Sequence, residues 1–286
     1  MFEGRSVKHT PGQNPDSPAR KSSSGEEKET GAPAPADDRT LRCRYEMKYH
    51  ITESMAVAIA QFVKPYLQVD RYCKLQRSGD YPIVSLYLDS QNLQLCQESL
   101  TGQKNRYKLR IRSYTDEPDY PRFFEIKRRI NTVIVKSRAR VMDRDVAILL
   151  AGRPLPPQNY TADIETINQF QLYINSIRAR PAVLVRYMRQ AFEDTSHTKV
   201  RVTFDRELAY KVTSLPEVRL GGPGWQRNAY TEGGVVLEIK FTDFYPAWLS
   251  YMVKCFNLEQ QSISKYASSI KESCSLRFCA PQQMGY

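Results

Sequence analysis

The chain has 286 residues, of which 41% are hydrophobic and 26% charged, and its formal net charge is +11. No run of 18 or more apolar residues occurs, so a membrane-spanning helix is not expected. The cysteines form no CxxC pair and lie near no histidine cluster, which argues against a zinc site and fits reduced thiols in a cytoplasmic protein.

Residues 1–40 are rich in Pro, Gly, Ser, Glu and Lys and contain almost no large apolar side chains, so this segment is predicted to be a disordered tail. The tail holds 6 Lys and Arg against 7 Asp and Glu, which leaves 36 basic and 24 acidic residues in 41–286, or +12. The positive charge therefore belongs to the part expected to fold. Folded basic surfaces attract polyanions such as nucleic acid, acidic lipid headgroups or phosphate compounds.

The first predicted strand, residues 44–51, alternates strictly between charged and apolar or aromatic side chains. Thr52 then caps a predicted helix whose apolar residues recur at helical spacing. Seven more strands are predicted at 83–89, 105–114, 122–129, 132–141, 182–190, 199–208 and 235–242. Further helices are predicted at 143–152, at 164–177, from Pro246 and at 264–274.

Five of these strands combine one apolar face with one densely charged face. Beyond the first strand, the charged positions of the other four are Arg106, Lys108, Arg110 and Arg112; Glu125, Lys127 and Arg129; Lys136, Arg138 and Arg140; Glu238 and Lys240. An ordinary antiparallel sheet with one solvated face would explain any single strand. It explains the set poorly, because like charges in adjacent strands repel. The faces hold 13 basic and 4 acidic residues once five further positions are added, namely Arg44, Glu46, Lys48, Arg201 and Asp205.

An anion or interspersed carboxylates would neutralise such a face, and Arg and Lys match phosphate oxygens well. Carboxylates among the cations suit a hard divalent ion. A sheet curled with this face inward would form a cationic tunnel, and an eight-stranded barrel has room for one slim ligand. The predicted fold class is therefore α+β, an eight-stranded antiparallel β-barrel with helices packed on the outside.

Several motifs resemble the catalytic domain of the VTC (vacuolar transporter chaperone) family, the polyphosphate-polymerase branch of the triphosphate tunnel metalloenzymes. The motifs are RYEMKYHI at 44–51, SLYLDS at 85–90, RYKLRIRSY at 106–114, FFEIKRRINTVIVKSRARV at 123–141, RYMRQAF at 186–192, VRVTFDREL at 200–208, VLEIKFTDFYPAWL at 236–249 and SISKYASS at 262–269. They follow the family's order and span about 41–275. The first strand reads Arg-x-Glu-x-Lys, whereas hydrolytic relatives typically read Glu-x-Glu-x-Lys. The replacement of the first carboxylate by Arg44 resembles the polymerase branch.

The resemblance implies roles for individual residues. Its phosphate-binding basic positions match Lys48, Arg110, Arg112, Lys127, Lys136, Arg189, Arg201 and Lys265. Its metal-binding glutamate matches Glu238, and Ser264 and Tyr266 flank Lys265. Lys240 adds a further substrate-binding cation from the charged face, and Glu46 and Glu125 are further metal candidates. Arg186 and Arg189 have opposite parity in one strand, so both point inward only if the strand has a bulge; the resemblance favours Arg189.

The function implied is transfer of the γ-phosphate of ATP to a polyphosphate chain, with Mn²⁺ or Mg²⁺ as cofactor. Two alternatives remain open at this point: a metal-dependent tripolyphosphatase or nucleoside triphosphatase on the same scaffold, and a non-catalytic polyphosphate-binding module. The expected partners are ATP, polyphosphate or another triphosphate, and a membrane-protein partner stays open. Nucleic acid is not expected, because the aromatic residues alternate to the face opposite the cations.

Overall fold

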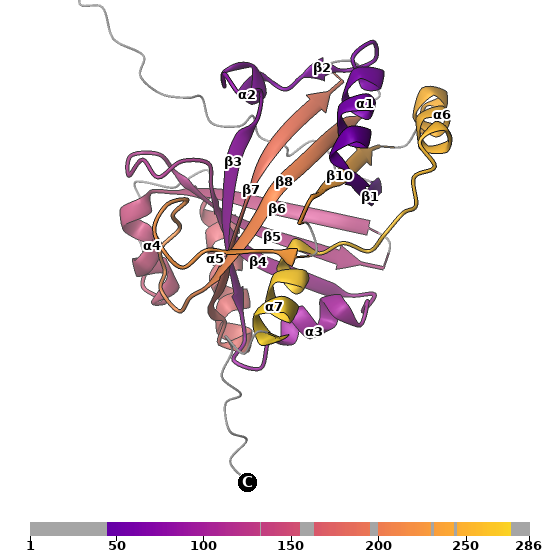
Figure 1. The fold of residues 1–286 in the computed structure, drawn as a ribbon. Coiled ribbons are helices and arrows are strands. Elements are labelled where there is room, and N and C mark those ends of the chain that lie inside the picture. The colour runs from indigo at the N-terminus through magenta and orange to yellow at the C-terminus, as the bar shows by residue number, and fades with distance from the viewer. Residues whose placement is uncertain are drawn as a thin grey trace, which may run out of the picture. The chain divides into compact units, whose positions relative to one another are not determined.

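The computed structural model describes residues 45–131, 133–154, 163–194, 200–229, 232–242 and 245–275. The predicted disordered tail, residues 1–40, and Arg44 lie outside these ranges. Within them the chain forms one mixed α+β unit, built around a single antiparallel sheet (Figure 1).

Eight long strands form this sheet, and all eight were predicted from the alternation of side chains. In chain order they are β1 (Tyr45–Thr52), β3 (Tyr81–Asp89), β4 (Arg106–Ser113), β5 (Arg122–Ile130), β6 (Val133–Val141), β7 (Arg180–Glu193), β8 (Arg201–Val212) and β10 (Gly234–Phe241). Their order across the sheet is β1-β10-β8-β7-β3-β4-β5-β6. Two short strands that were not predicted, β2 (Gln68–Val69) and β9 (Gln226–Arg227), pair with β7 and β8.

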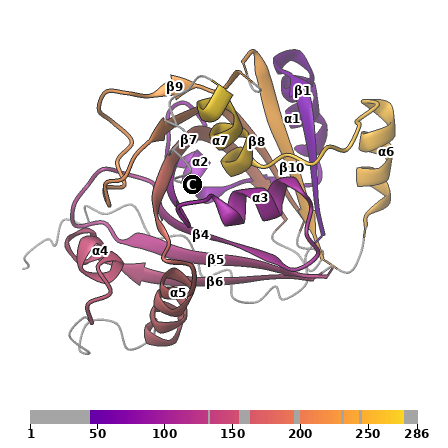
Figure 2. The same cartoon turned by 90° about the horizontal axis from the view of Figure 1, so that it is seen from below.

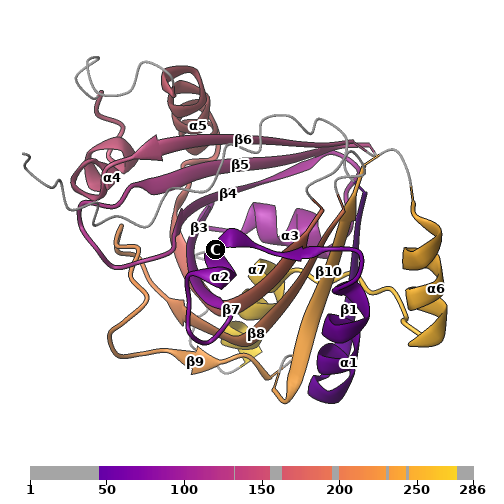
Figure 3. The ribbon, with the colours of Figure 1, turned by 90° about the horizontal axis from the view of Figure 1, so that it is seen from above.

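The sheet curls strongly, so that β4, β5 and β6 face β8, β10 and β1 across a concave side (Figures 2 and 3). Its edges are β1 and β6, which do not pair with each other among the described residues. The predicted fold class is confirmed: the protein is α+β, with eight antiparallel strands curled into a half-barrel.

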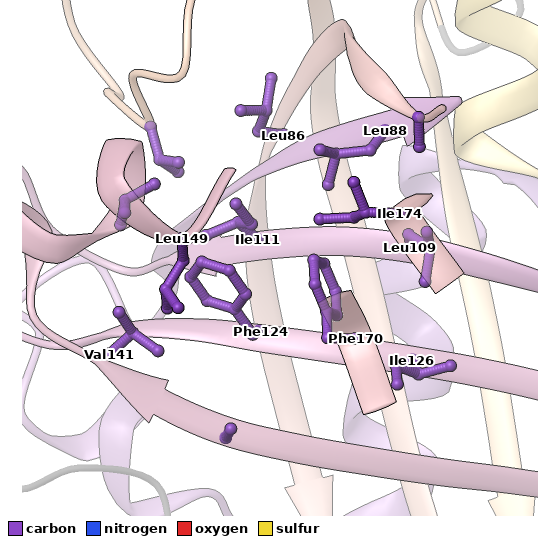
Figure 4. Packing of buried hydrophobic residues seen from close by; sticks show 14 of the residues in the cluster. Leu86, Leu88, Leu109, Ile111, Phe124, Ile126, Val141, Leu149, Phe170 and Ile174 are labelled. Carbon is purple, nitrogen blue, oxygen red and sulfur yellow. The ribbon is translucent and has the colours of Figure 1, made fainter. Parts of the chain in front are cut away.

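Four helices cover the convex side, and two hydrophobic clusters lie beneath them. Helices α4 (Asp143–Leu150) and α5 (Ile164–Ile177) pack over β4, β5 and β6. Figure 4 shows Phe170 and Ile174 of α5 among Leu109, Ile111 and Phe124 of the strands. Helices α1 (Glu53–Val63) and α6 (Ala247–Cys255) cover a second cluster, which contains Ile239 of β10. The apolar strand faces thus point outward, as the alternation predicted.

Helix α7 (Lys265–Ser275) lies instead within the curl, near α3 (Gln94–Leu100), while the short helix α2 (Arg71–Lys74) lies towards the other end of β3 (Figures 1 and 3). The side chains of Tyr266, Ala267 and Ile270 join a buried cluster with Tyr87 and Tyr210 of the strands. One end of the concave side is therefore filled by apolar packing. Among the described residues, no helix combines the length and apolar character needed to cross a membrane.

Local sequence explains where several helices begin and end. Thr52 adopts an extended conformation and its hydroxyl accepts a hydrogen bond from the Met55 backbone N–H at 3.3 Å, which starts α1 as predicted. Pro246 is the N-cap of α6, one position before the first turn. Helix α4 is followed by Gly152, whose φ of 73° is available to glycine without steric cost.

Candidate active site

The charged faces of the long strands meet on the concave side of the sheet, because alternate residues of a strand point to the same face. The register places oppositely charged residues side by side: Lys48 of β1 is opposite Glu238 of β10, and Arg110 of β4 is opposite Glu125 of β5. Each of these carboxylates is the centre of a cluster of cations.

The first cluster surrounds Glu238. Its Oε1 atom lies 2.7 Å from Lys265 Nζ and 3.5 Å from Lys48 Nζ. Its Oε2 atom lies 2.9 Å from Lys240 Nζ and 3.6 Å from an Arg189 nitrogen. Four of the predicted phosphate-binding cations are thus gathered on one carboxylate from four different elements.

Asp205 of β8 extends this cluster. Arg189 binds it through two parallel hydrogen bonds of 2.6 and 2.7 Å, and Lys265 Nζ lies 2.6 Å from its Oδ2 atom. The ammonium of Lys265 therefore bridges Asp205 and Glu238, two carboxylates on neighbouring strands. Because bidentate arginine–carboxylate pairs fix geometry as well as charge, Arg189 is held firmly on the concave side.

Arg186 lies on the opposite side of the same strand. It donates to the Leu220 carbonyl at 2.6 Å and stacks over the Trp225 ring at 4.3 Å, beside the convex cluster. The bulge that would bring both arginines inward is absent from β7 at this point. The register shift falls on β8 instead, at Glu207, whose φ is 54°.

Glu46 of β1 links the two sides of the curl. Its Oε1 atom lies 3.0 Å from Lys48 Nζ and its Oε2 atom 2.7 Å from Lys127 Nζ of β5. Lys48 also donates to the Ile263 carbonyl at 3.0 Å, just before α7. Glu46 therefore connects Lys127, on one side of the curl, to Lys48 and the Glu238 cluster on the other side.

The second cluster surrounds Glu125, which is completely buried. Arg110 Nε lies 2.6 Å and Lys136 Nζ 3.0 Å from its oxygens, with Arg138 at 3.5 Å and Arg112 at 3.9 Å. The hydroxyls of Tyr87, Tyr187 and Tyr114 accept further hydrogen bonds from these arginines, at 3.2–3.5 Å. Glu125 thus stands apart from Glu238 and Glu46.

Ser264 and Tyr266, which flank Lys265, have different surroundings. The Ser264 hydroxyl accepts from Lys108 Nζ at 2.8 Å and from the Ala267 backbone N–H at 3.1 Å. The Tyr266 ring is buried, stacks on Tyr87 at 4.7 Å, and its hydroxyl donates to Asp89. Ser264 faces the cations, whereas Tyr266 serves the packing of α7.

Arg201, like Tyr266, is a predicted site residue that the two clusters do not include. It lies opposite Lys240 in the sheet, but its guanidinium binds Asp70 at 2.7 Å and Glu193 at 2.5 Å. Neither Asp70 nor Glu193 is among the charged-face residues that were identified from the sequence.

Electrostatics keeps these buried carboxylates ionised. Burial raises the pKa of Glu238, but Lys240 and Lys265 outweigh it and hold the pKa well below its ordinary value. The same balance lowers the pKa of Glu125 through Arg110 and Lys136. Burial lowers the pKa of Lys240 to about 8, although Glu238 opposes this shift.

A family model described as the VTC domain matches residues 43–273. The chain belongs to the VTC domain family. Its fold is similar to two solved structures. A candidate adenylate cyclase from Bacillus halodurans is 13% identical, with 78% of this chain and 94% of that chain covered and a TM-score of 0.44. The PH1819 protein of Pyrococcus horikoshii is 10% identical, with 81% and 99% covered and a TM-score of 0.41. No curated protein matches the sequence.

The carboxylates of this VTC domain differ in how well they are placed to bind a divalent metal ion. No group of three or more His, Cys, Asp or Glu side chains is assembled for a metal within the described residues. Asp205 and Glu238 nevertheless both lie within 2.7 Å of the Lys265 ammonium, so their oxygens already converge on one cation. Two carboxylates supplemented by phosphate oxygens and water suit Mg²⁺ or Mn²⁺. Glu125 is held in the other cluster.

Three charged residues of the VTC domain site were given no individual role from the sequence: Lys108, Arg138 and Asp205. All three belong to the charged faces, so the alternation was sufficient to place them on the concave side. Their neighbours come from distant parts of the chain, as with Lys108 and Ser264, 156 positions apart. Strand alternation contains no information about such pairs.

Proposed function

We propose that this VTC domain is a polyphosphate polymerase-type phosphotransferase, which moves the γ-phosphate of ATP onto a polyphosphate chain bound along the concave face. The observation that carries the proposal is the Glu238 cluster, in which Lys48, Arg189, Lys240 and Lys265 converge from four elements. Their charge-assisted donors match phosphate oxygens.

The chemistry needs positioning and charge neutralisation more than a covalent protein nucleophile. An oxygen of the terminal phosphate attacks the γ-phosphorus of ATP, the bond from that phosphorus to the β,γ-bridging oxygen breaks, and ADP leaves with the electron pair. Lys265, Lys48, Lys240 and Arg189 bind and orient the reacting phosphates. Arg110, Arg112, Lys127 and Lys136 bind the chain on the opposite side of the curl, with Arg201 and Ser264 as further contacts.

Glu238, together with Asp205, would hold Mn²⁺ or Mg²⁺ in this proposal. The metal, when bound, neutralises charge on oxygens of the transferring group. Glu46 then keeps Lys48 and Lys127 in place, and Glu125 balances the charge of the second cluster. The role of these two glutamates is positioning, in contrast to the metal-binding role considered from the sequence.

The test is incubation of the full chain with ATP and Mn²⁺, followed by gel staining for polyphosphate. Long polymer is expected from the wild type, and Glu238→Gln should fold and lose turnover by roughly 10²–10³-fold. Lys254→Met, a change on the exposed surface of α6, is the control and should retain activity.

Orthophosphate without polymer would replace the proposal with hydrolysis of ATP or short polyphosphate. Binding of polyphosphate without any turnover of ATP would replace it with a non-catalytic module. Near-normal turnover by folded Glu238→Gln at saturating Mn²⁺ would remove Glu238 from the metal site and make it a counter-charge for the cations.

A further inference from the structure

Lys108 differs from the other lysines on the concave face. No carboxylate of the described residues lies within 4.0 Å of its ammonium, whereas Lys48, Lys127, Lys136, Lys240 and Lys265 each pair with at least one. Its Nζ atom is instead 2.8 Å from the Ser264 hydroxyl. Lys108 is thus a cation held in place without an anionic partner among the residues that the structure describes.

The neighbours of Lys108 add to its positive charge. Lys127 is directly opposite it in the sheet, and Lys136 follows in the next strand, so three lysines form a row across β4, β5 and β6. Like charges at directly opposed positions destabilise a sheet. Burial, followed by Lys48 and Lys127, lowers the pKa of Lys108 well below its ordinary value. Without a bound anion, the charge of Lys108 therefore destabilises the folded protein.

The Ser264 hydroxyl is arranged to donate. Its oxygen already accepts from Lys108 and from the Ala267 backbone N–H. A hydroxyl has one proton to donate, and no acceptor for this proton is found in the part of the chain that the structure describes. Ser264 also precedes the first turn of α7, an 11-residue helix whose N-terminal end carries partial positive charge.

We propose that Lys108 and Ser264 form a separate anion subsite, which takes one phosphoryl group of the bound phosphate chain. The inference rests on the proposed function and goes beyond it, because it distinguishes two classes of cation on the concave face. Cations of the first class are balanced by carboxylates in the empty protein. Lys108 represents the second class, and its counter-charge is the ligand.

Two variants separate this role from a structural one. Lys108→Met keeps the length of the side chain and removes its charge. Ser264→Asp keeps an N-cap for α7 and supplies a carboxylate beside Lys108, so that the protein itself fills the subsite. Lys254→Met on α6 is the matched control for loss of one lysine. Lys48→Met is the comparison for a balanced cation, since Lys48 pairs with Glu46 and Glu238.

The measurements are thermal unfolding in phosphate-free buffer and calorimetric titration with pyrophosphate, on the full chain. We expect Lys108→Met and Ser264→Asp to raise the Tm of the empty protein and to weaken pyrophosphate binding by roughly ten- to a hundredfold. Lys48→Met should lower the Tm of the empty protein, because its carboxylate partners raise the pKa of Lys48 and so stabilise its charged form. Lys254→Met should change neither quantity.

Wild-type affinity for pyrophosphate in both Lys108→Met and Ser264→Asp would overturn the subsite while leaving the proposed function in place. A Tm lowered by Lys108→Met, as by Lys48→Met, would also overturn it, because Lys108 would then be a structural cation. Failure of the wild type and of Lys254→Met to bind any phosphate compound would overturn the proposed function as well.

Discussion

Glu125 is buried and has four cationic neighbours, so its negative charge neutralises much of the positive charge on the β4–β5–β6 side of the site. Breaking a buried ionic network by removing one partner is strongly destabilising, because the remaining charges stay buried without compensation. This cost applies to Glu125 as a residue, whatever ligand the concave face binds.

We therefore predict that Glu125→Gln lowers the free energy of unfolding by about 3–5 kcal/mol at neutral pH. The pKa of Glu125 is depressed in the folded protein, so its contribution is present above the ordinary value of 4.5 and is lost as the pH falls through the folded-state pKa. The difference between wild type and variant should accordingly shrink in acid. Urea unfolding across this pH range measures it.

Glu259→Gln, a change at an exposed glutamate, is the control and should leave stability nearly unchanged at every pH. A constant difference between Glu125→Gln and the wild type down to strongly acidic pH would contradict the prediction, because packing and not charge would then explain the loss.

At the scale of an element, Asp89, the last residue of β3, makes buried contacts with both α3 and α7. Asp89 accepts from the Leu95 and Cys96 backbone N–H groups at the start of α3, both at 2.9 Å, and also from the Tyr266 hydroxyl. The same carboxylate therefore holds α3 and α7 together. Since Lys265 is the first residue of α7, the orientation of this helix positions its ammonium between Asp205 and Glu238.

Tyr266→Phe should loosen α7 while keeping the ring that stacks on Tyr87. We expect a loss of about 1–3 kcal/mol in stability, faster hydrogen exchange of the α7 amides, and a lower kcat with little change in KM. Tyr251→Phe, at a largely exposed position of α6, is the control. Unchanged exchange in α7 would show that the Asp89 contact does not hold the helix.

For the whole molecule, the excess of cations on the concave face links ligand binding to stability. Repulsion among the cations decreases when a polyanion binds, and a ligand that binds only the folded state adds about 2.7 kcal/mol at a hundredfold excess over its Kd. Triphosphate or ATP should therefore raise the Tm, and more so with Mn²⁺. Sodium chloride at equal ionic strength is the control, and equal shifts with salt and triphosphate would contradict specific binding.

Sequence alternation was sufficient for the eight long strands and for the face on which the charged side chains of β4, β5 and β10 lie. It could not distinguish Arg186 from Arg189, because the choice depends on where the strand register shifts, and the shift lies at Glu207 of the neighbouring strand. The helices α2 and α3 and the strands β2 and β9 span two to seven residues, too few to show a period. The docking of α7 within the curl depends on Tyr266 meeting Asp89, 177 positions earlier.

Under the proposed function, the two edge strands determine how a polyphosphate chain could reach the concave face. Because β1 and β6 are not hydrogen-bonded to each other in the described residues, the backbone hydrogen bonding around the curled sheet is interrupted there. The Glu46–Lys127 ion pair connects β1 to β5 across this interruption. A fully closed ring would admit a chain only by threading from one end. If polyphosphate is the ligand, as proposed, we expect it to enter an interrupted ring from the side once the Glu46–Lys127 ion pair opens, so a chain with both ends blocked should still bind.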